Sequence, residues 1–215
     1  MIKNSKLKIL ITSLIIIIPM VAGIIMWNTL PEKMATHWGI SGEVDGYGSK
    51  AMVVFGLPIF ILAIHLICTF AANSAPKNKN MGKKPFALVL WICPVVSLLC
   101  GFLSYGHALG YEFNVNTIMP LFMGVLFIAV GNYMPKISRN YTMGIKVPWT
   151  LNSDENWNKT HRFAGILWVA GGVIILLTSF LQNINLMLAV IFICAFLPMI
   201  YSYIYYKKHE KTDEE

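Results

Sequence analysis

The chain has 215 residues, of which 56% are hydrophobic and only 13% are charged. Soluble domains carry about 25% charged residues, so this composition excludes an ordinary soluble domain and indicates an integral membrane protein. The net charge of +7 raises the alternative of a nucleic-acid-binding protein, and the positions of the basic residues decide between the two.

Six stretches are long and apolar enough to cross a bilayer, which takes about 20 residues. The predicted spans are, in chain order and approximately, Ile9–Trp27, Ala51–Ala72, Phe86–Tyr105, Asn116–Tyr133, Phe163–Leu181 and Leu186–Tyr206. The first has a basic flank like that of a signal peptide, but its apolar run is too long and no cleavage site of small residues follows it. We therefore expect it to remain as a helix, and we predict an all-α integral membrane protein built as a six-transmembrane-helix bundle.

Basic residues fall almost entirely in the segments that alternate to one side of these spans. All but two of the 17 lysines and arginines lie at the start, in the second loop, in the long loop before the fifth span or in the tail. The exceptions are Lys33 and Lys50 in the first loop. Because cytoplasmic segments of membrane proteins are enriched in Lys and Arg, the pattern predicts cytoplasmic N and C termini. It also argues against direct binding of nucleic acid.

The predicted spans carry almost no ionisable side chains. No Asp, Glu, Lys or Arg lies in the middle of a span. Buried charges of that kind mark proton relays and ion pathways, so the sequence argues against a proton-coupled pump. His65 does lie near mid-span, and we expect a neutral, hydrogen-bonded packing residue. The four cysteines lie within apolar spans, which favours buried free thiols.

The loop between the first two spans, residues 28–50, is rich in glycine and turn-forming residues. Asp45 and Gly46 form a turn signal in it. His37, Glu43 and Asp45 have side chains that bind metals, but their spacing is weak evidence, and a solvated loop explains the same residues. We therefore predict no metal site and no bound cofactor.

Residues 140–165 form the longest polar interruption of the apolar sequence. Gly144 permits a turn that a side chain would oppose, and Pro148 favours an extended Val147. Ser153 has the character of a helix N-cap, and the two residues after it are acidic, which suits the first turn of a helix: Asp154 and Glu155. A helix that begins there runs directly into the fifth span.

Along that helix Trp157, His161 and Gly165 recur every four residues, with Thr160 beside them, and therefore share one face. Arg162 lies on a neighbouring face and could bind a phosphate or a carboxylate with two hydrogen bonds. These residues suit a functional site, although Trp and Arg are also common anchors at membrane boundaries. No hydrolase, metalloprotease, phosphate-loop or dinucleotide-binding signature occurs in the sequence, so we predict no catalytic residues.

Two segments resemble a known family. Residues Leu30–Lys50 are similar to the DUF1648 signature, and residues Met134–Gly165 are similar to the SdpI signature. Both motifs in this order, with six spans, resemble the SdpI-type immunity proteins. The resemblance implies two modules: residues 1–75, with two helices and the outer loop, and residues 76–215, with four helices and a long cytoplasmic loop over 134–162.

The resemblance also implies a role in the bacterial cell membrane. The founding member of the family protects a bacterium from its own secreted, membrane-active cannibalism peptide, and it is implicated in holding a cytoplasmic transcriptional repressor at the membrane. The implied partners are membrane lipids, a secreted peptide toxin and such a repressor. The implied function is therefore immunity, with signalling as a second part of it.

Residues that match the family patterns become candidate site residues. For toxin binding at the outer loop they are His37, Trp38, Gly42, Asp45 and Lys50. For the cytoplasmic loop they are Asn140, Gly144, Trp149, Thr150, Trp157, Thr160, His161, Arg162 and Gly165. At position 146 the family usually has Arg. Lys146 keeps the charge, loses the paired hydrogen bonds, and is retained as a candidate.

Two other functions fit parts of the sequence. A small-molecule or lipid transporter fits the prolines that five of the six spans contain, although the lack of charge within the spans argues against it. A membrane enzyme could use His161 and Arg162 on a substrate at the cytoplasmic face. Uptake without any toxin would favour the first alternative, and product formation by the purified protein would favour the second.

Overall fold

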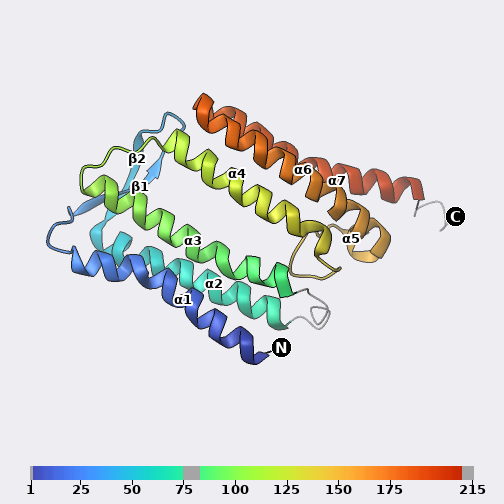
Figure 1. Ribbon diagram of the computed structural model, residues 1–215, viewed down its shortest axis with the longest axis horizontal. Helices are drawn as coiled ribbons and strands as arrows, with labels where there is room; N and C mark the ends of the chain where they lie inside the picture. Colours follow the sequence, from blue (N-terminus) through green and yellow to red (C-terminus); the bar gives the residue numbers. More distant parts are fainter. Residues whose placement is uncertain (1, 75–82, 210–215) are drawn as a thin grey trace. The chain divides into compact units, whose positions relative to one another are not determined.

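The computed structural model describes residues 2–74 and 83–209. Six helical segments within these residues are long and apolar enough to cross a membrane, as predicted (Figure 1). They are α1 (Ile2–Ile25), α2 (Leu57–Ser74) with the π-helical turn Met52–Gly56 before it, α3 (Lys83–Ala108), α4 (Val115–Tyr133), α6 (Asp154–Leu181) and α7 (Ile184–His209). Most begin or end a few residues beyond the predicted spans, because polar first and last turns do not contribute to an apolar window.

The prediction of an all-α fold was wrong in the first loop. Strands β1 (Lys33–Trp38) and β2 (Val44–Ser49) form an antiparallel hairpin there. The turn signal at Asp45 and Gly46 was also misplaced, since both residues lie within β2 and Gly46 pairs with His37. A Cβ at Gly46 would lie 2.8 Å from the Cβ of His37, so this glycine serves a close approach of the two strands.

The chain forms two compact units, Met1–Ala71 with Ala87–Val115, and Ala72–Phe86 with Asn116–Glu215. We call them unit 1 and unit 2. This division in space differs from the predicted module boundary after residue 75, because most of α3 packs in unit 1. The module boundary remains a prediction about sequence families. Three predicted inner-side lysines, Lys77, Lys79 and Lys211, lie outside the described residues.

Unit 1 joins α1, α2, α3 and the hairpin. Hydroxyl groups of α3 donate to carbonyls of α1 around Pro19, which lacks an N–H group and disturbs the hydrogen bonding of its own helix. Ser97 donates to the carbonyl of Ile16 at 2.9 Å and Tyr105 to that of Pro19 at 2.7 Å. His65 is buried and hydrogen-bonded to Thr12, with 3.0 Å between Nε2 and Oγ1, which confirms the expectation of a hydrogen-bonded packing histidine.

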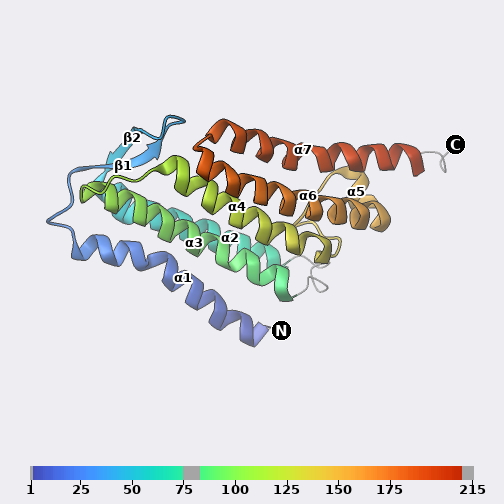
Figure 2. The same ribbon diagram turned by 45° about the horizontal axis from the view of Figure 1, so that its top comes forward.

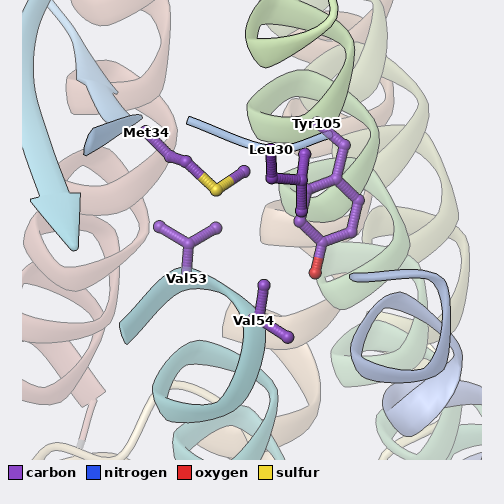
Figure 3. Close-up of a cluster of buried hydrophobic side chains, with 5 residues drawn as sticks. All are labelled: Leu30, Met34, Val53, Val54 and Tyr105. Atoms are coloured by element: carbon purple, nitrogen blue, oxygen red, sulfur yellow. The ribbon is translucent and has the colours of Figure 1, made fainter. Parts of the chain in front are cut away.

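An apolar cluster lies where the hairpin meets the helices of unit 1. Figure 3 shows its five buried side chains, Leu30, Met34, Val53, Val54 and Tyr105. Met34 comes from β1 and Val53 from the π-helical turn before α2, and Tyr105 comes from α3. The cluster fixes the hairpin to the ends of the helices, because each of these elements buries part of its apolar surface there.

Unit 2 packs α4 antiparallel to α6 through glycines. A Cβ on Gly124 would lie 2.8 Å from the carbonyl oxygen of Gly172, and a Cβ on Gly131 would lie 3.0 Å from that of Gly165. Small residues of this kind let membrane helices approach closely. Helices α6 and α7 run side by side in Figures 1 and 2. The indole of Trp168 links them by donating to the α7 carbonyl of Cys194 at 2.8 Å.

Candidate functional site

The tip of the hairpin presents an exposed pair of side chains. Nδ1 of His37 lies 2.5 Å from Oδ1 of Asp45, and the side chains are 72% and 55% exposed. Glu43 is not part of this pair, although its main chain closes the turn by accepting a hydrogen bond from Gly39 N–H at 2.9 Å. Gly42 has φ of +86° in the same turn. The hairpin therefore offers a polar, solvent-facing surface with a fixed backbone.

Trp38 lies beside this pair and turns toward the body of unit 1. Its ring meets that of His107 edge-on, with centroids 6.3 Å apart. Since His107 belongs to the last turn of α3, the contact ties the end of β1 to that helix. Trp38 is half-buried, so only part of the ring remains available to a ligand.

Lys50 differs from the other candidates of the first loop because it is buried. Its ammonium donates to the carbonyls of Trp27 at 3.2 Å and Leu30 at 3.1 Å, and it pairs with Glu32 at 2.8 Å. It also lies over the Trp27 ring, 4.8 Å from the centroid. The lysine joins the start of the π-helical turn to the segment after α1. Because these partners occupy the ammonium, it is not available to a ligand. Lys50 instead helps to hold the hairpin in position, since it directly follows β2.

The segment between α4 and α6, residues 134–153, is docked on the buried face of α6. We call it the connecting segment. It contains a short 3₁₀ turn, Met134–Lys136, and the helix α5, Pro148–Asn152. The indole of Trp157 donates to the carbonyl of Ile137 at 2.7 Å, and the ring stacks on that of His161 with centroids 4.0 Å apart. Both rings are buried, which confirms that they share one face of the helix.

The hydrogen bonds of His161 define its tautomer. Nε2 accepts from the N–H of Ile145 at 3.0 Å and therefore carries no proton. Nδ1 lies 2.8 Å from the carbonyl oxygen of Trp157 and therefore donates. The ring is thus neutral, and neither nitrogen is free for proton transfer.

Glycine is required at position 144, where the connecting segment passes the stacked rings of Trp157 and His161. Its φ is +111°, which favours glycine. A Cβ there would collide with Nε2 of His161 and would lie 2.9 Å from the Trp157 ring. The predicted turn is confirmed, and the extended Val147 and the Ser153 N-cap are confirmed as well.

Two candidates shape the connecting segment from within. The amide oxygen of Asn140 accepts from the N–H groups of Thr142 at 2.8 Å and Met143 at 2.7 Å. The hydroxyl of Thr150 donates to the carbonyl of Ile145 at 2.7 Å. Both side chains are buried, so they stabilise the loop conformation and cannot reach a partner.

A second polar network joins α5, α6 and α7. Trp149 donates to the Ser202 hydroxyl at 2.5 Å, and the Asn156 amide donates to the Ser202 carbonyl at 3.1 Å. Thr160 donates to the amide oxygen of Asn156 at 3.0 Å. Gly165 continues the same helix and packs against the ring of Pro135. Trp157 and Gly165 thus contact the connecting segment, and Thr160 is linked to α7 through Asn156.

Lys146 and Arg162 are the exposed candidates of this region. The ammonium of Lys146 caps the carbonyls of Tyr141 and Thr142, at 3.4 and 3.2 Å. Arg162 is exposed, whereas its neighbour in the chain, His161, is buried.

Several residues of these networks escaped the sequence analysis. Asn156 precedes Thr160 by four residues and shares its face, which was the signal available for it. Arg139 gave no such signal, and it bonds the carbonyl of Leu151 at 2.6 Å and pairs with Asp154 at 2.6 Å. Glu32 and Ser202 became visible only through the fold. Among the described residues no three His, Cys, Asp or Glu side chains gather as a metal site.

Comparison with known proteins shows what this chain is similar to. Residues 14–62, which include the hairpin, match DUF1648, a domain of unknown function, and residues 136–202 match the SdpI/YfhL protein family. Over 208 residues the chain is 28% identical to the Immunity protein SdpI of Bacillus subtilis (strain 168), covering 94% of this chain and 97% of the relative. The chain therefore resembles SdpI-type proteins in both matched segments and over nearly its whole length.

The SdpI/YfhL match has a structural counterpart in unit 2. It spans the connecting segment, α6 and most of α7, which are the elements joined by the two buried networks. No solved structure matches this chain. Its similarity to SdpI and its six apolar helices indicate a multi-pass protein of the cytoplasmic membrane.

Proposed function

We propose that this chain is an immunity protein that protects a bacterium against a secreted, membrane-active peptide toxin of the cannibalism type. The observation that carries the proposal is its likeness, over nearly the whole of both chains, to a protein named for immunity. The two segments that match families contain the hairpin with its His37–Asp45 pair and most of the connecting segment with its buried hydrogen bonds. Both ring nitrogens of His161 are engaged in hydrogen bonds, which argues against the enzymatic alternative that uses this residue.

The proposed orientation places both termini in the cytoplasm and the hairpin outside, following the distribution of Lys and Arg. A secreted peptide then meets the hairpin first. The exposed pair of His37 and Asp45, with the free part of Trp38, is the proposed contact. Lys50 supports that contact by holding the hairpin in place.

The connecting segment is the proposed cytoplasmic element. Its buried residues keep one conformation of the segment on α6, and its exposed residues, Lys146 among them, are available to a cytoplasmic protein. A transcriptional repressor recruited when toxin is bound is the partner we propose for this face. Coupling between the hairpin and the connecting segment is part of the same proposal.

Toxin challenge of a sensitive bacterium tests the function. Cells expressing the chain should survive cannibalism-type peptides at concentrations that kill cells with an empty vector. His37→Ala and Asp45→Asn should reduce survival at unchanged abundance in the membrane, whereas Lys33→Gln, an exposed change on β1, should not. Undiminished killing by every peptide, with the protein verified in the membrane, would refute immunity toward those toxins.

A further inference from the structure

Helix α6 carries an exposed stripe that joins a cation to apolar side chains. Ile166, Val173, Leu177 and Phe180 are 68, 47, 56 and 80% exposed. They follow Arg162, which is exposed as well, at intervals of three to seven residues that keep them on one side of a helix. The stripe begins with a guanidinium and continues as an apolar surface along the membrane-spanning part of the helix.

The carboxylates near Arg162 are paired with other cations. Of the described acidic residues at this end of unit 2, Asp154 is paired with Arg139 at 2.6 Å. Glu155 is paired with Lys159 at 3.4 Å and accepts from the Tyr205 hydroxyl at 2.6 Å. Arg162 has no carboxylate partner among the described residues, so its fork of donors remains available to an anion from outside the chain.

Aromatic side chains place Arg162 at the boundary of the apolar region. The neighbouring residue, Phe163, stacks on Tyr201 of α7 with centroids 4.7 Å apart. Further along α7, the rings of Tyr203 and Tyr206 pack on Trp149, with centroids 5.2 and 6.2 Å from that of the indole. Clusters of Trp and Tyr mark the level of lipid headgroups in membrane proteins.

We propose that this stripe is a binding site for an anionic phospholipid, with the phosphate on Arg162 and an acyl chain along Ile166, Val173 and Leu177. A phospholipid matches both parts of the stripe, because it carries an anion and an apolar chain in one molecule. A water-soluble acidic protein would match only the guanidinium. The site does not depend on the proposed immunity function.

Native mass spectrometry of the purified full chain in detergent tests the site. The probe is phosphatidylglycerol, compared with phosphatidylcholine of the same acyl chains. The wild type should prefer phosphatidylglycerol about fivefold, the effect of one basic residue at an anionic surface. Arg162→Gln should remove this preference, and Arg162→Lys should keep part of it. Lys159→Gln removes the same charge from a cation that is already paired, and it should keep the full preference.

Three results would overturn the proposal. The first is equal binding of both lipids by the wild type, and the second is an unchanged preference in Arg162→Gln. The third is loss of the preference when inorganic phosphate is added at the lipid concentration, because the site would then bind any phosphate. Ile166→Ser provides a further check, since it should weaken both lipids while it preserves their ratio.

Discussion

Lys50 should control whether the hairpin stays attached to unit 1, and Lys50→Met tests this directly. Methionine keeps the length of the apolar stem and removes the ammonium, which donates to two carbonyls and is 8% exposed. Each hydrogen bond to a charged group contributes about 1.5–3 kcal/mol, and the desolvation cost of the ammonium offsets part of this gain. The Glu32 partner is 87% exposed and adds less than about 1 kcal/mol.

We therefore expect Lys50→Met to weaken the docking of the hairpin by about 2–3 kcal/mol. If the hairpin opens locally, its amides should exchange hydrogen for deuterium roughly 30- to 150-fold faster. The measurement is hydrogen–deuterium exchange of β1 and β2 in lipid nanodiscs. Lys33→Met makes the same change at an exposed lysine of the hairpin and should leave exchange unchanged. Equal exchange in wild type and Lys50→Met would show that the Lys50 ammonium does not hold the hairpin in place.

Three further substitutions test the packing of the connecting segment and α6. Gly144→Ala should lower the free energy of unfolding by about 3 kcal/mol, through an unfavourable φ and a collision with the stacked rings. Gly110→Ala is the control, because Gly110 has a similarly positive φ but open space around it, and it should cost only about 1 kcal/mol. If both variants lowered the melting temperature equally, the collision at Gly144 would be contradicted. His161→Phe keeps a stacking ring and leaves the Ile145 N–H without its acceptor. Proteolysis of the connecting segment should therefore accelerate about tenfold. An unchanged rate would show that this hydrogen bond does not hold the segment on α6. Gly165→Ala should cost about 1–3 kcal/mol by pressing on Pro135, whereas Gly56→Ala, with its nearest neighbour at 3.6 Å, should be tolerated in the same thermal unfolding assay.

Features set by local sequence could be predicted. The six spans follow from apolar length, and the start of α6 follows from Ser153 and the acidic residues after it. The shared face of Trp157 and His161 follows from helical spacing, and the turn at Gly144 follows from the freedom of glycine. In each case the physical cause lies within a few neighbouring residues, so no knowledge of the fold was needed.

Features set by distant contacts escaped prediction. The carbonyl partners of Lys50 lie 20 and 23 residues before it in the chain, and nothing near Lys50 announces them. Ser202 meets Asn156 and Trp149 only because α7 packs on α6. The hairpin was missed because its strands are short and Gly46 resembles a turn residue, although it serves a close strand contact. The helix α5 has five residues, too few for a periodic signal.

Protection of a membrane by the purified protein tests immunity most directly. Proteoliposomes with and without the full chain would be given a potassium gradient and treated with a cannibalism-type peptide, and loss of membrane potential would be followed by a voltage-sensitive dye. We expect the chain to slow peptide-induced depolarisation, and we expect His37→Ala to abolish this effect while it leaves reconstitution unchanged. Depolarisation at the same rate with and without the chain, for peptides against which it protects cells, would contradict a direct action on the toxin at the membrane.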